Sequence, residues 1–172
     1  MIICAGKSEQ FDFAVPVGIG MVDVAMNLTK LCMGETPKYL LFIGTAGSYG
    51  EKKIFDIVES KAATNIENSF FIGGSYTPID NLVSATEDVS RETLVNSSNY
   101  ITKNQEIGKH YIEKNIHLEN MEYFAVLKVA QTFGIPAGGV FCITNYCDKN
   151  AHEDFLKNQK EAMEKLAAFI QK

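Results

Sequence analysis

The stretch ENMEYFAV, residues 119–126, carries two glutamates three positions apart at the start of an almost wholly apolar run. Glu119 or Glu122 could point into a site and accept hydrogen bonds there. Both could equally be helix-start charges that complement the positive end of a helix dipole. Taken alone, the stretch favours the helix-start interpretation, so other residues must decide between the two.

Three further segments place polar or small residues where an apolar run ends. The small residues of GTAGS let backbone N–H groups approach an anion or a base, and Thr45 adds a hydroxyl. In SSNYIT, Tyr100 offers a flat ring for stacking, and in ITNYCD the amide of Asn145 can donate and accept at once. A tight turn, a core tyrosine and a turn-forming asparagine explain these segments equally well when each is taken alone.

Alternating strand and helix patterns must position these segments. Short runs rich in Val, Ile and Phe and bounded by Gly or Pro predict strands, at residues 1–4, 13–20, 38–47, 54–64, 69–76, 93–102 and 138–147. Amphipathic spacing and stop signals predict helices over residues 20–34, 119–136 and 151–171. The polar stretch 77–92 is the predicted long loop and a candidate for a mobile one. The alternation predicts an α/β fold, one domain over residues 1–172 with a central mixed, largely parallel sheet flanked by helices. Ligands of such sheets bind beyond the carboxyl ends of the strands.

Composition and charge limit the function classes. The 172 residues are 46% hydrophobic and 22% charged, an ordinary globular balance for one domain. A net charge of −5 argues against nucleic-acid binding. No apolar run approaches the ~20 residues that a membrane span needs, and MIICAGKSEQ lacks the basic start of a signal peptide. We therefore expect a cytoplasmic protein without membrane partners.

The cysteines predict buried thiols rather than a metal site. They are Cys4, Cys32, Cys142 and Cys147. No two have CxxC spacing, three lie in apolar runs, and the three histidines are scattered away from them. We expect reduced cysteines and no metal.

The functional segments, in this order, are similar to those of a known family. The sequence resembles the nucleoside phosphorylase and nucleosidase superfamily, which includes purine nucleoside phosphorylases and methylthioadenosine/adenosylhomocysteine nucleosidases. VGIGMVDVAMN resembles its Gly-x-Gly turn and first long helix, and IGTAGS its Gly-Ser-Ala-Gly or Gly-Ser-Cys-Gly turn. SSNYIT resembles its base-stacking segment, ENMEYFAV its Met-Glu-Ala helix start, and ITNYCDKNAHEDF its Ser-Asp strand end and closing helix. The likeness runs from about residue 14 to the C-terminus and indicates a short member.

The resemblance implies roles on the sugar side of a site. Glu122 matches the glutamate that accepts both ribose cis-hydroxyls, and Met121 matches the methionine on the apolar side of the sugar. Thr45 matches the small hydroxyl residue that touches phosphate in phosphorylases, so phosphate is expected against Thr45, Ala46 and Gly47. Glu119 keeps the interpretation of a charge near a helix N-terminus.

On the base side, Tyr100 matches the aromatic residue against the purine, and Ile101 the residue whose backbone contacts it. Asn145 matches the residue that faces purine N7, where negative charge develops as the glycosidic bond breaks. The nucleosidases and the hexameric phosphorylases usually carry Asp there. An amide donates to N7 and O6 without supplying a proton, which favours hypoxanthine and guanine over adenine. Asp148 ranks second as an acid acting from a displaced position.

Phosphate binding departs from the family pattern. Phosphorylases usually bring several arginines to phosphate, whereas this chain has one, Arg91, and carries Phe42 where an arginine is expected. The region before the Gly-x-Gly turn is also shorter than usual. In the loop after the first strand, Lys7 favours phosphate, whereas Glu9 falls close to the glutamate that activates water in nucleosidases. Exposed loop charges remain the alternative for both residues.

The sequence favours a pentosyltransferase, a purine nucleoside phosphorylase that splits inosine or guanosine with inorganic phosphate and needs no other cofactor. One alternative is a hydrolase of methylthioadenosine, adenosylhomocysteine or a futalosine-like hypoxanthine nucleoside, with Glu9 as base. Another is a nucleoside-binding paralogue without activity. The family resemblance implies a homo-oligomer, a dimer or a hexamer, in which a neighbour could supply Arg91 or a lysine to phosphate.

Overall fold

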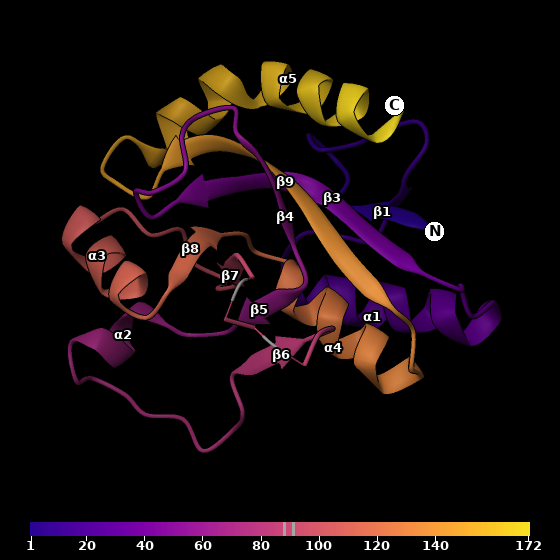
Figure 1. The fold of residues 1–172 in the computed structure, drawn as a ribbon, viewed down its shortest axis with the longest axis horizontal. Coiled ribbons are helices and arrows are strands. Elements are labelled where there is room, and N and C mark those ends of the chain that lie inside the picture. The colour runs from indigo at the N-terminus through magenta and orange to yellow at the C-terminus, as the bar shows by residue number, and fades with distance from the viewer. Residues whose placement is uncertain (88, 91) are drawn as a thin grey trace.

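A mixed sheet forms the centre of the computed structural model, which describes residues 1–87, 89, 90 and 92–172 (Figure 1). The nine described strands are β1 (Ile2–Cys4), β2 (Val15–Pro16), β3 (Leu40–Ser48), β4 (Ile57–Ser60), β5 (Ala62–Thr64), β6 (Leu82–Ser84), β7 (Leu94–Asn96), β8 (Ile116–Glu119) and β9 (Ala137–Tyr146). The described helices are α1 (Gly20–Gly34), α2 (Asn68–Phe71), α3 (Gln105–Glu113), α4 (Tyr123–Phe133) and α5 (Ala151–Ile170).

Strand β3 joins the parts of the sheet. It pairs in parallel with β1 and along its whole length with β9, and its last two residues pair antiparallel with β8. Five strand pairings are parallel and three are antiparallel. The predicted mixed, largely parallel sheet is therefore confirmed, and β3 and β9 are the continuous apolar runs expected of strands covered on both faces.

Helices cover both faces of β3 and β9. Figure 1 shows α5 above these strands and α1 with α4 on the opposite side. Successive residues of β3 alternate between the faces. Phe42 packs with Tyr123 and Phe141 on the α1 and α4 side, and Ile43 joins the cluster under α5. Phe42 is thus a fully buried core residue. It cannot bind phosphate as the arginine expected at this position from the family resemblance would.

The predicted strand at residues 69–76 is wrong. These residues instead include most of the short helix α2, followed by a turn through Gly73 and Gly74. Gly73 has a φ of 69°, in the left-handed region that glycine tolerates without strain. None of the side chains of α2 is buried, so its apolar residues lack the covered sheet face that a strand needs. The predicted loop 77–92 is also interrupted by β6.

The predicted helix 119–136 begins four residues late. Residues 116–119 form β8, which the sequence analysis missed, and α4 starts at Tyr123. The side-chain oxygen of Asn120 accepts from the backbone N–H groups of Glu122 and Tyr123, both at 3.0 Å, so it caps the first turn. Helix α3 was missed as well, whereas α1 and α5 match their predicted ranges within one residue.

All four cysteines are buried free thiols, as predicted. Among the described residues no helix is both long enough and apolar enough to cross a membrane.

Candidate active site

A cavity of about 260 Å³ opens where the carboxyl ends of β3 and β9 meet the starts of α4 and α5. This is the edge at which ligands of parallel sheets bind. The structure brings eight of the predicted site residues together in its lining: Glu9, Thr45, Ala46, Gly47, Ile101, Met121, Glu122 and Asn145.

Three predicted residues are not among the described lining residues. Tyr100 follows β7 with its side chain 76% exposed, although its neighbour Ile101 reaches the cavity. Lys7 is exposed on a turn with a φ of 54°. Asp148 accepts a hydrogen bond from the backbone N–H of Asn150 at 2.8 Å, beside the start of α5. The single arginine, Arg91, lies outside the described residues.

Glu122 is a buried carboxylate held at the start of α1. Its Oε1 accepts the backbone N–H of Gly20 at 2.9 Å, which places negative charge at the positive end of that helix dipole. Burial raises the pKa of Glu122 to about 7 and the nearby Glu9 carboxylate also raises it, whereas the hydrogen bond from Gly20 opposes the rise. Only one oxygen is used by Gly20, so the other can accept from a ligand.

Glu9 accepts hydrogen bonds from two donors of Thr45, in the second half of β3. Its carboxylate accepts the backbone N–H of Thr45 at 3.0 Å and also the Thr45 hydroxyl. A tight turn, closed by two hydrogen bonds between Gly6 and Glu9, directs the side chain there. A Cβ on Gly44 would lie 3.1 Å from the Glu9 carboxylate, so glycine keeps room for it. Burial raises the pKa of Glu9, and the two Thr45 donors oppose that rise.

Asn145 presents a fixed amide to the cavity. Its Oδ1 accepts the Thr144 hydroxyl at 2.8 Å, and its Nδ2 donates to the carbonyl of Tyr146 at 3.1 Å. Because an amide nitrogen carries two N–H groups, one remains for a ligand. The residue is nine-tenths buried, so this donor works in an environment where hydrogen bonds are strong.

The interpretation of Glu119 as a helix-start charge is wrong. It ends β8, is 7% exposed and lines the cavity. Its Oε1 accepts the backbone N–H of Thr102 at 2.8 Å, and its Oε2 accepts the Thr102 hydroxyl and, at 3.0 Å, the Tyr49 hydroxyl. Burial raises the pKa of Glu119, and these hydrogen bonds oppose the rise. The sequence signal for the residue was the strand pattern IHLE, which was not recognised.

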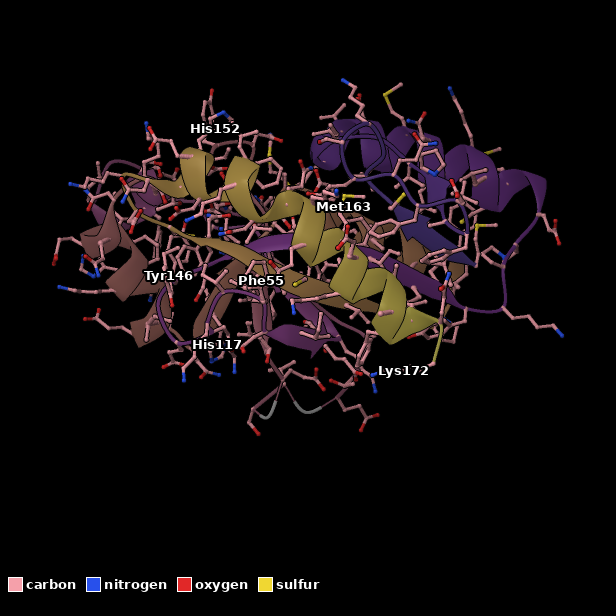
Figure 2. All side chains as sticks on the ribbon, turned by 90° about the horizontal axis from the view of Figure 1, so that it is seen from above. Phe55, His117, Tyr146, His152, Met163 and Lys172 are labelled. Carbon is pink, nitrogen blue, oxygen red and sulfur yellow. The ribbon has the colours of Figure 1, made fainter. Side chains whose placement is uncertain are left out.

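Three residues of α5, Ala151, His152 and Phe155, also line the cavity and were not predicted. Figure 2 shows His152 at the N-terminal end of α5, on the other side of the helix from Tyr146 and His117. Farther along the same helix, Gln159 donates to the carbonyl of Ser8 at 3.0 Å and so holds the turn that carries Glu9. The helix thus forms one wall of the cavity and supports another.

The lining of the cavity is acidic. It contains three carboxylates, Glu9, Glu119 and Glu122, and no lysine or arginine among its described residues. Its hydroxyl, amide and carboxylate oxygens can accept hydrogen bonds from N–H and O–H groups of a ligand.

Fold and cavity together define an α/β protein with a cavity at the strand ends. A family profile described as "Phosphorylase superfamily" matches residues 3–172. The chain therefore belongs to the phosphorylase superfamily. A comparison with curated protein sequences gives no match.

Solved structures similar to this chain include several nucleosidases. A mutant of the Helicobacter pylori methylthioadenosine/adenosylhomocysteine nucleosidase, with 5′-methylthioadenosine in its active site, matches with a TM-score of 0.82 at 17% identity over 99% of this chain and 95% of that one. A futalosine hydrolase mutant of H. pylori matches with a TM-score of 0.81 at 17% identity over the same shares. The Streptococcus pneumoniae nucleosidase with a transition-state inhibitor matches with 0.77 at 17%, over 98% and 95%. At this identity they show the common fold.

Proposed function

We propose that the protein hydrolyses the N-glycosidic bond of purine ribonucleosides, with a preference for 6-oxopurine bases. The observation that carries the proposal is that the Glu9 carboxylate accepts hydrogen bonds from the N–H and the hydroxyl of Thr45. These are the donors that the family resemblance assigns to phosphate. A carboxylate in their place favours water, not phosphate, as the nucleophile.

Electrostatics supports the same choice. Two like charges 4 Å apart repel by about 4 kcal/mol at an effective dielectric constant of about 20. A phosphate near Glu9 would meet that repulsion and also the charge of Glu122, and no described lysine or arginine of the lining offsets it. A neutral water molecule meets neither penalty.

The sugar would be held by Glu122 and Met121. The Glu122 oxygen not used by Gly20 accepts the ribose hydroxyls, and these charge-assisted hydrogen bonds fix the ring against Met121. A water molecule held by Glu9 attacks the anomeric carbon and gives its proton to Glu9. Burial raises the pKa of Glu9, and a higher pKa makes its carboxylate a stronger base.

The base would leave toward Asn145. As the bond to the purine nitrogen breaks, the electron pair stays on the purine, and the free N–H of Asn145 stabilises the charge at N7 or O6. The departing base takes up a proton from the solvent, and Glu9 releases its proton to the solvent, which restores the carboxylate. A 6-oxopurine suits this arrangement, because its ring carries the charge without prior protonation by an acid, which Asn145 cannot supply. The similar solved structures, which are nucleosidases and a futalosine hydrolase, support hydrolysis.

A phosphate titration tests the proposal. Purified protein is incubated with inosine in phosphate-free buffer and in buffer with increasing phosphate, and hypoxanthine, ribose and ribose 1-phosphate are quantified. We expect hypoxanthine release at the same rate in both buffers, with ribose as the sugar product.

Release that requires phosphate and yields ribose 1-phosphate would establish the phosphorylase that the sequence favours. If inosine raises the melting temperature but no purine nucleoside is cleaved, the protein is a nucleoside-binding paralogue. The expected homo-oligomer remains a prediction, which light scattering on the purified protein tests.

A further inference from the structure

Strand β9 carries a β-bulge beside the cavity. The register with β3 pairs Ala46 with Ile143. It then pairs Gly47 with Asn145, so Thr144 is the extra residue. A bulge leaves its extra residue unpaired, bends the strand and re-aims the side chain next to it. The direction in which Asn145 presents its amide therefore depends on what holds Thr144.

Asn158 of α5 holds the extra residue of this bulge. Its Nδ2 donates to the carbonyl of Thr144 at 2.8 Å. The hydroxyl of Thr144 in turn donates to Oδ1 of Asn145 at 2.8 Å and so fixes the orientation of that amide. Thr144 and Asn145 line the cavity, whereas Asn158 is not among the described residues of the lining. Asn158 therefore acts on Asn145 through one residue.

The sequence of α5 singles out Asn158 as well. One face of the helix carries, at the spacing of a helical stripe, Ala151, Phe155, Asn158, Ala162 and Leu166. Ala162 and Leu166 are fully buried in the cluster that also contains Ile43 of β3 and Cys142 of β9. Asn158 is the polar member of this stripe. An amide in such a place costs free energy unless it is hydrogen-bonded, and the carbonyl of Thr144 is its partner.

Gln159, the next residue of α5, holds another wall of the cavity. Its Nε2 donates to the carbonyl of Ser8 at 3.0 Å, directly before Glu9. Consecutive residues of a helix point about 100° apart, so the two amides reach two different segments from one turn of α5. Figure 1 shows that α5 lies over β3 and β9. The helix therefore joins the strand end that carries Asn145 to the turn that carries Glu9.

We propose that Asn158 and Gln159 are positioning residues that fix Asn145 and Glu9 relative to one another through α5. The inference rests on the proposed hydrolysis, in which water at Glu9 attacks while the base leaves toward Asn145. Both groups must be in place in the same transition state, and a displacement of about 1 Å can lower a rate about 10²-fold. Two side chains that touch no reacting atom thus contribute to kcat.

Two double-mutant cycles test the inference by steady-state kinetics with inosine. Asn158→Leu removes the donor and keeps the stripe filled. We expect kcat to fall about tenfold with KM changed less than about threefold, because a small displacement affects the transition state most. In an Asn145→Ala background the same substitution should lower kcat less than about twofold, because the group that Asn158 positions is gone.

The second cycle combines Gln159→Leu with Glu9→Gln and should give the same pattern, since Gln159 acts through the turn of Glu9. Lys157→Leu, at the exposed neighbour of Asn158, is the matched control and should leave kcat unchanged in every background. If Asn158→Leu does not fold, Asn158→Ala removes the amide without adding bulk, and the same coupling is expected.

An NMR measurement follows the link to Asn145 without turnover. The side-chain amide signals of Asn145 in isotope-labelled protein are assigned by their absence from Asn145→Ala. We expect Asn158→Leu to shift or broaden these signals while most other amide signals stay in place. Lys157→Leu should leave all of them unchanged.

Equal losses of kcat from Asn158→Leu in the presence and absence of Asn145 overturn the inference, because they mark a general loss of structure. Unchanged Asn145 signals in Asn158→Leu overturn it as well. If cleavage requires phosphate or does not occur, but these signals respond, the proposed function fails and the positioning of Asn145 by Asn158 stands.

Discussion

The two sides of the cavity that we assign to the sugar and to the base are built differently. On the sugar side, Glu9 and Glu122 come from loop and helix-start positions, and backbone N–H groups of Thr45 and Gly20 hold them. On the base side, Asn145 and Glu119 end neighbouring parts of one sheet, and strand register sets their spacing. The sugar side therefore depends on local turns and on the repulsion between two acids, and the base side depends on the long-range pairing of β3, β8 and β9.

The largest expected effect falls on the sugar side. Glu9→Gln removes the proposed base but keeps a side chain that can accept from Thr45. General-base catalysis contributes about 10²- to 10⁴-fold, so we expect kcat for inosine hydrolysis to drop by that factor with little change in melting temperature. Steady-state kinetics with Glu35→Gln, an exposed glutamate after α1, provide the matched control. Full activity in Glu9→Gln would remove Glu9 from the mechanism.

A second substitution tests whether Glu122 binds the ribose hydroxyls. Glu122→Gln should lower kcat/KM for inosine about 100-fold, because a pair of charge-assisted hydrogen bonds is weakened. The same variant should change kcat/KM for 2′,3′-dideoxyinosine less than threefold, since that nucleoside lacks both hydroxyls. Equal losses on the two nucleosides would contradict the role. Glu122→Ala should likewise lower activity on ribonucleosides far more than its loss of stability explains.

The pH dependence of stability sharpens the same comparison. The pKa of Glu122 rises from 4.5 to about 7 on folding. The contribution of Glu122 to the free energy of unfolding is therefore fully present below about pH 4.5 and is lost as pH rises through 7. At 1.36 kcal/mol per pH unit the loss approaches about 3 kcal/mol. Urea unfolding of wild type and Glu122→Gln at pH 5 and pH 8 isolates it, because Glu9 and Glu119, whose pKa values also rise, are present in both proteins.

A flatter stability profile is expected for Glu122→Gln than for wild type. Identical profiles would show that Glu122 is ionised as easily in the folded protein as in the unfolded chain.

The smallest expected effect tests the base side. Gly47→Ala adds a Cβ within 2.9 Å of Nδ2 of Asn145, so one of them must shift. Overpacking of this kind destabilises by about 1–3 kcal/mol. We expect that loss in urea unfolding, together with weaker hypoxanthine binding and an unchanged Glu122 pH profile. Gly34→Ala, at the last residue of α1 with no atom within 4 Å of the added Cβ and no positive φ, is the control without collision.

Local patterns in the sequence were sufficient to predict much of this molecule. The apolar runs of β3 and β9 and the amphipathic helices α1 and α5 follow from spacing alone, and the four motif segments placed Glu122, Thr45 and Asn145 in one cavity. Glu9 could be named only as one of two alternatives, because its role depends on a turn that folds it onto Thr45.

The position of Glu119 in the cavity could not be predicted from the sequence, for a physical reason. Glu119 looked like a helix-start charge because a four-residue strand directly precedes the cap of α4, and no local periodicity separates IHLE from the helix that follows. Its contacts with Tyr49 and Thr102 join residues 70 and 17 positions away. Such pairings are set by the tertiary fold and leave no trace in neighbouring residues.

The hydrogen bond from Gln159 to the carbonyl of Ser8 joins residues 151 positions apart. During synthesis the turn that carries Glu9 leaves the ribosome well before the helix that fixes it. Asn145 and the wall formed by His152 and Phe155 also emerge late. A growing chain therefore carries Glu9 long before α5 is available, so the cavity can be completed only after that helix has been synthesised.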